Sequence, residues 1–382
     1  MTIPKLVLSS PADILAAVPY LVGFHPADSL VVAGVAGPDV RLTTRWDLPV
    51  ASGDLERLVA LLCREAVTAA FVVGYGSGAL VTPAVDTVTR LLHAGGIRVA
   101  ESLRAEGGRY WSYSCGSASC CPAEGTPYDT ERSQVAAEAV LHGLVALPDR
   151  GSLRRSVQRC GGAAMRRVTA RVMAELRALP EPGAPDADGV AARFVAEGLA
   201  RVRGAVGLYG SGRRLDDEGA ARLGLDLAVV RVRDEAWALI DDRDAHVALW
   251  RDLTRRLEPG HVAPAASLLA AAAWHRGECA LAGMALERAL AADPGYSMAL
   301  LLRQALVHMM SPAMLRDRMP TPEELDDEMG TPRAIWLAPL RALLAQDLPG
   351  RASASTPASA PASASTPAPA PAPGGRQSAS SS

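Results

Sequence analysis

The sequence predicts an α/β fold, with a mixed-sheet N-terminal domain over residues 1–148 and a mostly α-helical C-terminal domain over residues 190–348. Strand-like and helix-like runs alternate as far as residue 146, where both tight turns and helical crossovers connect them. Beyond residue 190 the apolar spacing is helical almost throughout. An arginine-rich helical connector is expected over residues 149–180 between the two domains.

Local signals place each element of the first domain. Ser10 caps a helix that begins at Pro11, and Pro19 is expected to end or kink it. Thr82 is expected to cap a later helix that starts at Pro83. The remaining expectations are strands at 29–35, 40–48, 71–75, 97–103 and 109–114, and helices at 53–69, 83–93 and 130–145.

The second half is expected to be helical from residue 151 to 179, to continue through a linker at 179–189, and to contain a short hairpin around 227–232. Small residues at helix-pair offsets predict a tetratricopeptide-like pair of helices at 263–310. Residues 349–382 are nearly all Pro, Ala, Ser and Thr, which predicts a disordered tail.

Composition excludes several classes of function. The net charge is −2 and the pI is about 6.4, so nucleic acid is not the expected partner. Lys5 is the only lysine among 39 basic residues, which excludes a P-loop and Schiff-base chemistry. No signal peptide is visible, and the longest apolar run, 263–274, is too short for a membrane helix. We therefore expect a cytoplasmic protein whose thiols stay reduced, with no membrane partner.

Three of the six cysteines lie in the segment CGSASCCP, directly after a predicted strand. Cys115, Cys120 and Cys121 are candidate ligands for zinc or another soft metal, with a fourth ligand from His25, His93, His142 or Cys160. The adjacent side chains of Cys120 and Cys121 are expected to diverge. A packing role and a redox or nucleophilic thiol are the alternatives.

Two further segments carry polar or flexible residues at strand ends. The loop FHPADS offers His25, Asp28 and Ser29, either as the wall of a pocket or as caps for the loop itself. The glycines from Gly74 to Gly78 follow a strand, with Glu101 expected at the end of the next strand. Their spacing departs from the dinucleotide-binding pattern, so an ordinary glycine-rich turn is favoured over a nucleotide site.

The segments LSSPADILAAVPYLVGFHPADSLVV, CGSASCCPAEGTP and AAAWHRGECALAGMALERALAADPGYSMA together resemble an actinobacterial family catalogued as domain of unknown function four-one-nine-two. The resemblance covers roughly residues 5–345. It implies one cytoplasmic unit without the tail, and it transfers no catalytic residues.

Two functions from different classes fit these observations. The first is a binding or regulatory module with a small-ligand or peptide pocket in the α/β domain and a protein or peptide partner for the helix pair. The second is a hydrolase-like enzyme that gathers His25, Asp28 and a cysteine in one pocket, with zinc as a possible cofactor. Both place the candidate pocket where the histidine–aspartate loop meets the cysteines.

Overall fold

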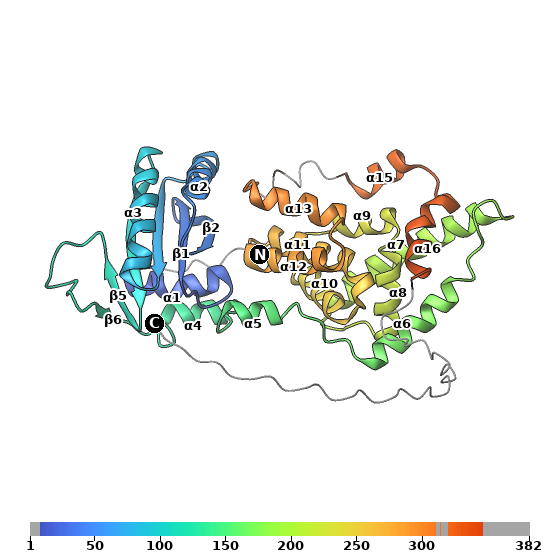
Figure 1. Ribbon diagram of the computed structural model, residues 1–382, viewed down its shortest axis with the longest axis horizontal. Helices are drawn as coiled ribbons and strands as arrows, with labels where there is room; N and C mark the ends of the chain where they lie inside the picture. Colours follow the sequence, from blue (N-terminus) through green and yellow to red (C-terminus); the bar gives the residue numbers. More distant parts are fainter. Residues whose placement is uncertain (1–7, 311–313, 315–319, 347–382) are drawn as a thin grey trace, which may run out of the picture. The chain divides into compact units, whose positions relative to one another are not determined.

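The structure, a computed structural model, describes residues 8–310, 314 and 320–346 (Figure 1). The predicted tail at 349–382 lies outside the described residues. Within them, a mixed sheet occupies the N-terminal part of the chain and most of the remainder is helical, as the α/β prediction requires.

The sheet has the strand order β2-β1-β3-β4-β5-β6. Among the paired strands only β3 and β4 run parallel, because helix α3 connects them as a crossover, whereas tight turns join β1 to β2 and β4 to β5. The strands are β1 Ser29–Ala36, β2 Asp39–Asp47, β3 Ala69–Tyr75, β4 Arg98–Glu106, β5 Arg109–Ser112 and β6 Thr126–Pro127.

Helices cover both faces of this sheet. Helix α1, Pro11–Val22, packs on the face that presents Val31, Val73 and Leu103. Helices α2, Ser52–Arg64, and α3, Gly78–Ala94, pack on the opposite face, which presents Val32 and Val72. Neighbouring residues of β1 and β3 thus point to opposite faces, and both faces are apolar because each is buried under a helix.

Helix α4 packs on α1, where Val135 is buried with Ala16 and Ala17, and most helices from α5 onward surround a second core in which Trp250 is fully buried. Its elements are α4 Gln134–Leu141, α5 Arg150–Arg155, α6 Ala163–Leu176, α7 Ala187–Gly210, α8 Asp217–Asp226, α9 Val230–Ala238, α10 Asp244–Arg256, η1 Pro259–His261, α11 Val262–His275, α12 Cys279–Ala292, α13 Ser297–Val307, α15 Pro322–Met329, η2 Ala334–Leu337 and α16 Ala338–Leu344.

Two helices continue through prolines that were expected to limit them. Helix α1 runs to Val22 with Pro19 inside it. Helix α3 begins at Gly78, so Thr82 and Pro83 lie within the helix instead of at its start. The early start of α3 buries Val81, whose Cγ1 would lie only 2.1 Å from a Cβ at residue 74. Tertiary packing therefore outweighs the local proline signal.

Other element limits also differ from the prediction. Helix α2 ends at Arg64 instead of residue 69, and the expected hairpin at 227–232 is wrong because α9 begins at Val230. The expected helix over 151–179 is two helices, α5 and α6. Gly161 separates them, and a Cβ there would lie 2.3 Å from the carbonyl oxygen of Arg256, so the chain passes too close for another residue.

Candidate metal centre

The clustered cysteines lie on the loop 113–125, which connects β5 to β6. Two β5 side chains hold its far end: Trp111 Nε1 donates to the Ala123 carbonyl oxygen at 2.9 Å, and Arg109 Nη1 donates to the Gly125 carbonyl oxygen at 2.7 Å. Gly125 has a φ of +81°, and a Cβ there would lie 2.6 Å from the Trp111 ring. Glycine is therefore needed where the loop closes on the strand.

The near end of the loop is held from β4. Ser112 Oγ accepts a hydrogen bond from the Cys115 amide at 3.2 Å and donates one to Glu101 Oε1 at 2.9 Å. Glu101 Oε1 also accepts from the Ser102 amide at 2.8 Å. This chain of hydrogen bonds fixes the backbone of Cys115 against the sheet.

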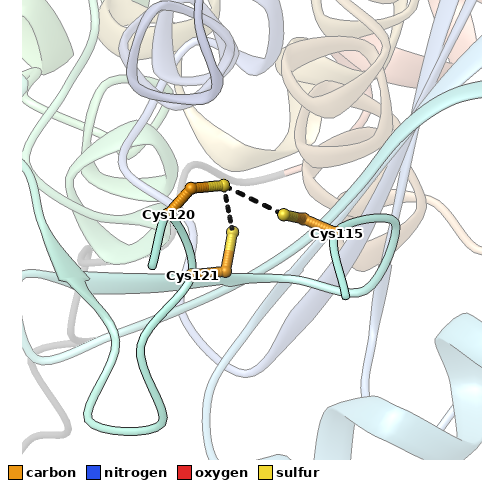
Figure 2. A group of neighbouring side chains, drawn as sticks. All are labelled: Cys115, Cys120 and Cys121. Carbon is orange, nitrogen blue, oxygen red and sulfur yellow. Dashed lines mark hydrogen bonds between the residues drawn. The ribbon is translucent and has the colours of Figure 1, made fainter. Parts of the chain in front are cut away.

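A single helical turn brings the other two thiols back toward Cys115. The amides of Cys120 and Cys121 both donate to the Ser117 carbonyl oxygen, at 3.2 and 2.8 Å. Successive side chains on a helical turn are about 100° apart instead of the 180° of a strand. The expected divergence of Cys120 and Cys121 is therefore wrong, and both side chains face the same cluster (Figure 2).

The three sulfur atoms form a compact triangle. Cys115 Sγ lies 3.0 Å from Cys120 Sγ, which lies 3.6 Å from Cys121 Sγ, and all three atoms are within 4.8 Å of one another (Figure 2). Cys120 is exposed and the other two thiols are partly exposed. The cluster is thus open to an incoming ion or reagent.

Mutual hydrogen bonding separates the acidities of the three thiols. The pKa of Cys115 is lowered, first because Cys120 donates a hydrogen bond to it. The pKa of Cys120 is raised by the same bond, and the pKa of Cys121 is raised to about 12, first through its hydrogen bond with Cys115. Cys115 is consequently the first of the three to become a thiolate, and the thiolate is the form that binds metal.

No histidine joins this cluster. All cysteines and histidines of the chain lie in the described residues, and within that part the thiol group comprises Cys115, Cys120 and Cys121 alone. The fourth ligand expected from His25, His93, His142 or Cys160 is therefore not supplied by the fold.

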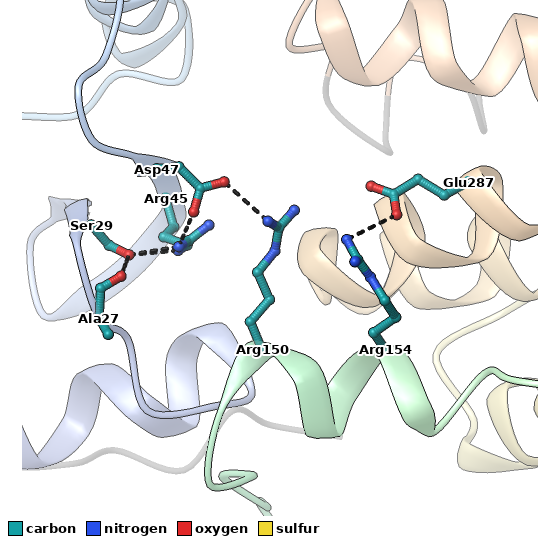
Figure 3. Close-up of polar contacts among 7 residues, drawn as sticks. All are labelled: Ala27, Ser29, Arg45, Asp47, Arg150, Arg154 and Glu287. Atoms are coloured by element: carbon teal, nitrogen blue, oxygen red, sulfur yellow. Dashed lines mark hydrogen bonds and ion pairs between the residues drawn. The ribbon is translucent and has the colours of Figure 1, made fainter.

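The loop FHPADS is engaged in local structure (Figure 3). Ser29 is fully buried; its Oγ donates to the Ala27 carbonyl oxygen at 2.5 Å and accepts from Arg45 Nη2 at 2.6 Å. Arg45 in turn pairs with Asp47 at 2.5 Å. The Ser29 hydroxyl therefore holds the start of β1 against β2, the capping role that was one of the two expectations for this loop.

Asp28 and His25 are exposed, and neither belongs to the thiol group. Asp28 adopts a φ of 44°, and a Cβ at Gly76 would lie 3.1 Å from its Oδ1, so it borders the loop after β3. Strands β3 and β4 separate β1 from β5, which corresponds to three strand spacings or about 14 Å. The expectation of one pocket shared by His25, Asp28 and a cysteine is therefore not supported.

The glycines after β3 have structural explanations. Gly74 leaves room for Val81, and Gly76 adopts a φ of 127°. A Cβ at Gly78 would face the guanidinium of Arg104 at 3.7 Å. Glu101 lies in the middle of β4 instead of at its end, so it does not occupy the position of a ribose-binding acid. These observations favour the ordinary turn over the nucleotide site.

Several arginines of the connector 149–180 form ion pairs, with the sheet at one end and with the later helices along the rest. Arg150 pairs with Asp47 of β2 at 3.1 Å, and Arg154 pairs with Glu287 of α12 at 3.5 Å (Figure 3). Two further arginines of 149–180 form ion pairs at 2.6 Å, Arg159 with Glu258 and Arg171 with Glu218.

Sequence reasoning missed the side chains that hold the thiol loop. Arg109 and Trp111 alternate with Tyr110 and Ser112 along β5, so they share one face of the strand. The order RYWS, which ends three residues before Cys115, was the available signal. An indole and a guanidinium are donors without acceptor function and suit the carbonyl groups of a returning loop.

A family model described as Domain of unknown function (DUF4192) matches residues 11–313. No curated protein and no solved structure matches the chain. Among the described residues, no helix has both the length and the apolar character needed to cross a membrane.

Proposed function

Since the chain belongs to the DUF4192 family, whose description names no activity, we propose from its geometry that it is a cytoplasmic regulatory module that binds a soft metal ion. The ligands are Cys115, Cys120 and Cys121. The observation that carries the proposal is the convergence of their three sulfur atoms within 4.8 Å of one another.

The surroundings of the three thiols favour a metal-binding role over a role in packing the hydrophobic core. None of the residues 113–125 belongs to a buried apolar cluster of the described residues, so the cysteines fill no core. Hydrogen bonds from both ends hold the loop. A preformed and exposed set of thiols reduces the ordering cost of binding an ion, because the ligands need little rearrangement.

Elemental analysis of reduced, tag-free protein tests this function. We expect a stoichiometric soft metal that is lost in Cys120→Ser and retained in Cys63→Ser. Cys63 is the matched control because it is also exposed and lies on α2, away from the thiol group, where it donates a hydrogen bond to the Gly95 carbonyl oxygen at 3.6 Å. Protein that neither contains a metal nor takes one up from zinc or copper(I) buffers contradicts the proposal, as does full retention by Cys120→Ser.

A hydrolase-like enzyme is the second candidate. Three protein ligands with water as the fourth is the arrangement of catalytic zinc sites, and the exposed Cys120 leaves space for a substrate. This candidate predicts that zinc-loaded protein hydrolyses ester or phosphoester substrates and that Cys120→Ser does not. Absence of turnover by protein with bound zinc favours the regulatory module.

We also propose that helices α11 and α12 form the expected tetratricopeptide-like pair and offer a surface to a protein or peptide partner. Ala270 and Ala282 are buried at 1% and 0% exposure, as close approach of two such helices requires. We expect Ala282→Leu to destabilise the protein by about 1–3 kcal/mol through overpacking. Gly283→Leu is the control, because a Cβ at Gly283 meets no atom within 4 Å. Equal urea midpoints for the two variants contradict a closely packed pair.

A further inference from the structure

The donor set of the candidate metal centre consists of sulfur alone. Thiolate ligands select soft ions such as copper(I) and zinc, whereas structural zinc sites almost always have four protein ligands. The chain has no cysteine or histidine outside the described residues, and within these only Cys115, Cys120 and Cys121 gather. A complete zinc site of four nitrogen or sulfur ligands therefore does not form within one chain.

The carboxylate of Glu101 lies near the thiols but does not act as a fourth metal ligand. Glu101 acts on Cys115 through its charge, and its Oε1 already accepts from Ser112 Oγ at 2.9 Å and from the Ser102 amide at 2.8 Å. A carboxylate oxygen is also a hard ligand, poorly matched to an ion chosen by three thiolates. Glu101 therefore positions Cys115 through Ser112 and adds negative charge beside a bound cation.

The size of the sulfur triangle suits one ion at its centre. With metal–sulfur bonds of about 2.3 Å, three sulfurs arranged around an ion in one plane lie about 4 Å apart. The two sulfur separations of 3.0 and 3.6 Å are shorter than this spacing, and all three sulfurs lie within 4.8 Å of one another, so side-chain rotations that spread the sulfurs slightly complete the site.

We infer that the thiol cluster is a three-coordinate site for copper(I), the soft monovalent ion that three thiolates satisfy without a fourth ligand. This inference rests on the proposed function, since it names the ion that the regulatory module binds. Ser112 is a positioning residue for the site because its hydroxyl holds the Cys115 amide at 3.2 Å.

X-ray absorption and competition with a chromophoric copper(I) chelator test the inference on the full-length, reduced protein without oxygen. A higher affinity for copper than for zinc does not by itself identify the ion that the site is built for, because most protein sites bind copper more tightly than zinc. We expect a copper edge of the monovalent ion with three sulfur scatterers and no nitrogen or oxygen. Each of Cys115→Ser, Cys120→Ser and Cys121→Ser should lower copper(I) affinity by more than about tenfold, and Cys63→Ser should leave it unchanged.

Ser112→Ala tests the positioning role. The variant should bind copper(I) up to about tenfold more weakly. It should keep three sulfur scatterers, because it removes the hydrogen bond that holds the Cys115 backbone but removes no ligand. Unchanged affinity in Cys121→Ser, or a nitrogen or oxygen scatterer in the copper form, overturns the three-coordinate site. Zinc bound with four protein ligands overturns the copper(I) inference but leaves the metal-binding function in place. Protein that binds neither ion overturns the function itself.

Discussion

Replacing His261 should make the protein more resistant to acid. His261 ends η1 with only 3% of its surface exposed, and burial lowers its pKa to about 4 from the ordinary 6.5. The folded protein therefore keeps this imidazole neutral, while the unfolded chain takes up a proton below about pH 6.5. Because the unfolded state then binds more protons, stability falls as pH falls from about 6.5 to about 4.

The size of the effect follows from this difference in pKa. At about 1.4 kcal/mol for each pH unit, the full penalty is about 3 kcal/mol, and about 2 kcal/mol of it is present at pH 5. Urea unfolding at about pH 7.5 and about pH 5 measures it. The wild type should lose about 2 kcal/mol more than His261→Gln between the two conditions, because all other acid-sensitive groups are common to both proteins.

The exposed His142 provides the control, and His142→Gln should follow the wild type at both pH values. If His261→Gln and the wild type lose the same free energy of unfolding on acidification, the buried imidazole is not held neutral and the reasoning is refuted.

Three further predictions concern ionisation, burial and closure of the loop. At neutral pH, iodoacetamide should label Cys115 before Cys121 in metal-free protein, because the pKa of the first thiol is lowered and that of the second is raised to about 12; equal labelling rates by peptide mass spectrometry contradict this order. Glu235→Ala should cost about 1–3 kcal/mol because Arg231 Nη1 loses its buried acceptor while Asp326 still pairs with the guanidinium, whereas the double variant with Arg231→Met should cost clearly less than the sum of the single changes in urea unfolding. Gly125→Ala should weaken metal binding in the same chelator competition through the close approach of the indole ring, and unchanged affinity contradicts the role of the closure.

The layers of the fold could be predicted because they depend on local periodicity. Residues of β1 and β3 are apolar on both faces, which indicates strands between helices. The start of α3 could not be predicted from Pro83, because the packing of Val81 over Gly74 depends on a contact between two elements. Local helix propensity is a weak predictor of where a helix begins when a tertiary contact determines its first turn.

The candidate site shows the same division. The clustering of Cys115, Cys120 and Cys121 was visible in the sequence, but their common direction depends on the helical turn at Ser117. The pocket expected between His25 and the thiols failed for a different reason. Strand order is a property of the whole sheet, and the sequence alone did not indicate that β3 and β4 lie between these segments.

The loop 113–125 is tied to its strand at both ends and contributes no side chain to the buried apolar clusters of the described residues. Its chemistry is therefore free to change without endangering the folding of the rest of the chain. A relative with a short connection in place of these thirteen residues would lose the thiols and keep the rest of the fold. The same loop could also be grafted onto another pair of antiparallel strands, provided that one strand carries a tryptophan and an arginine on the same face.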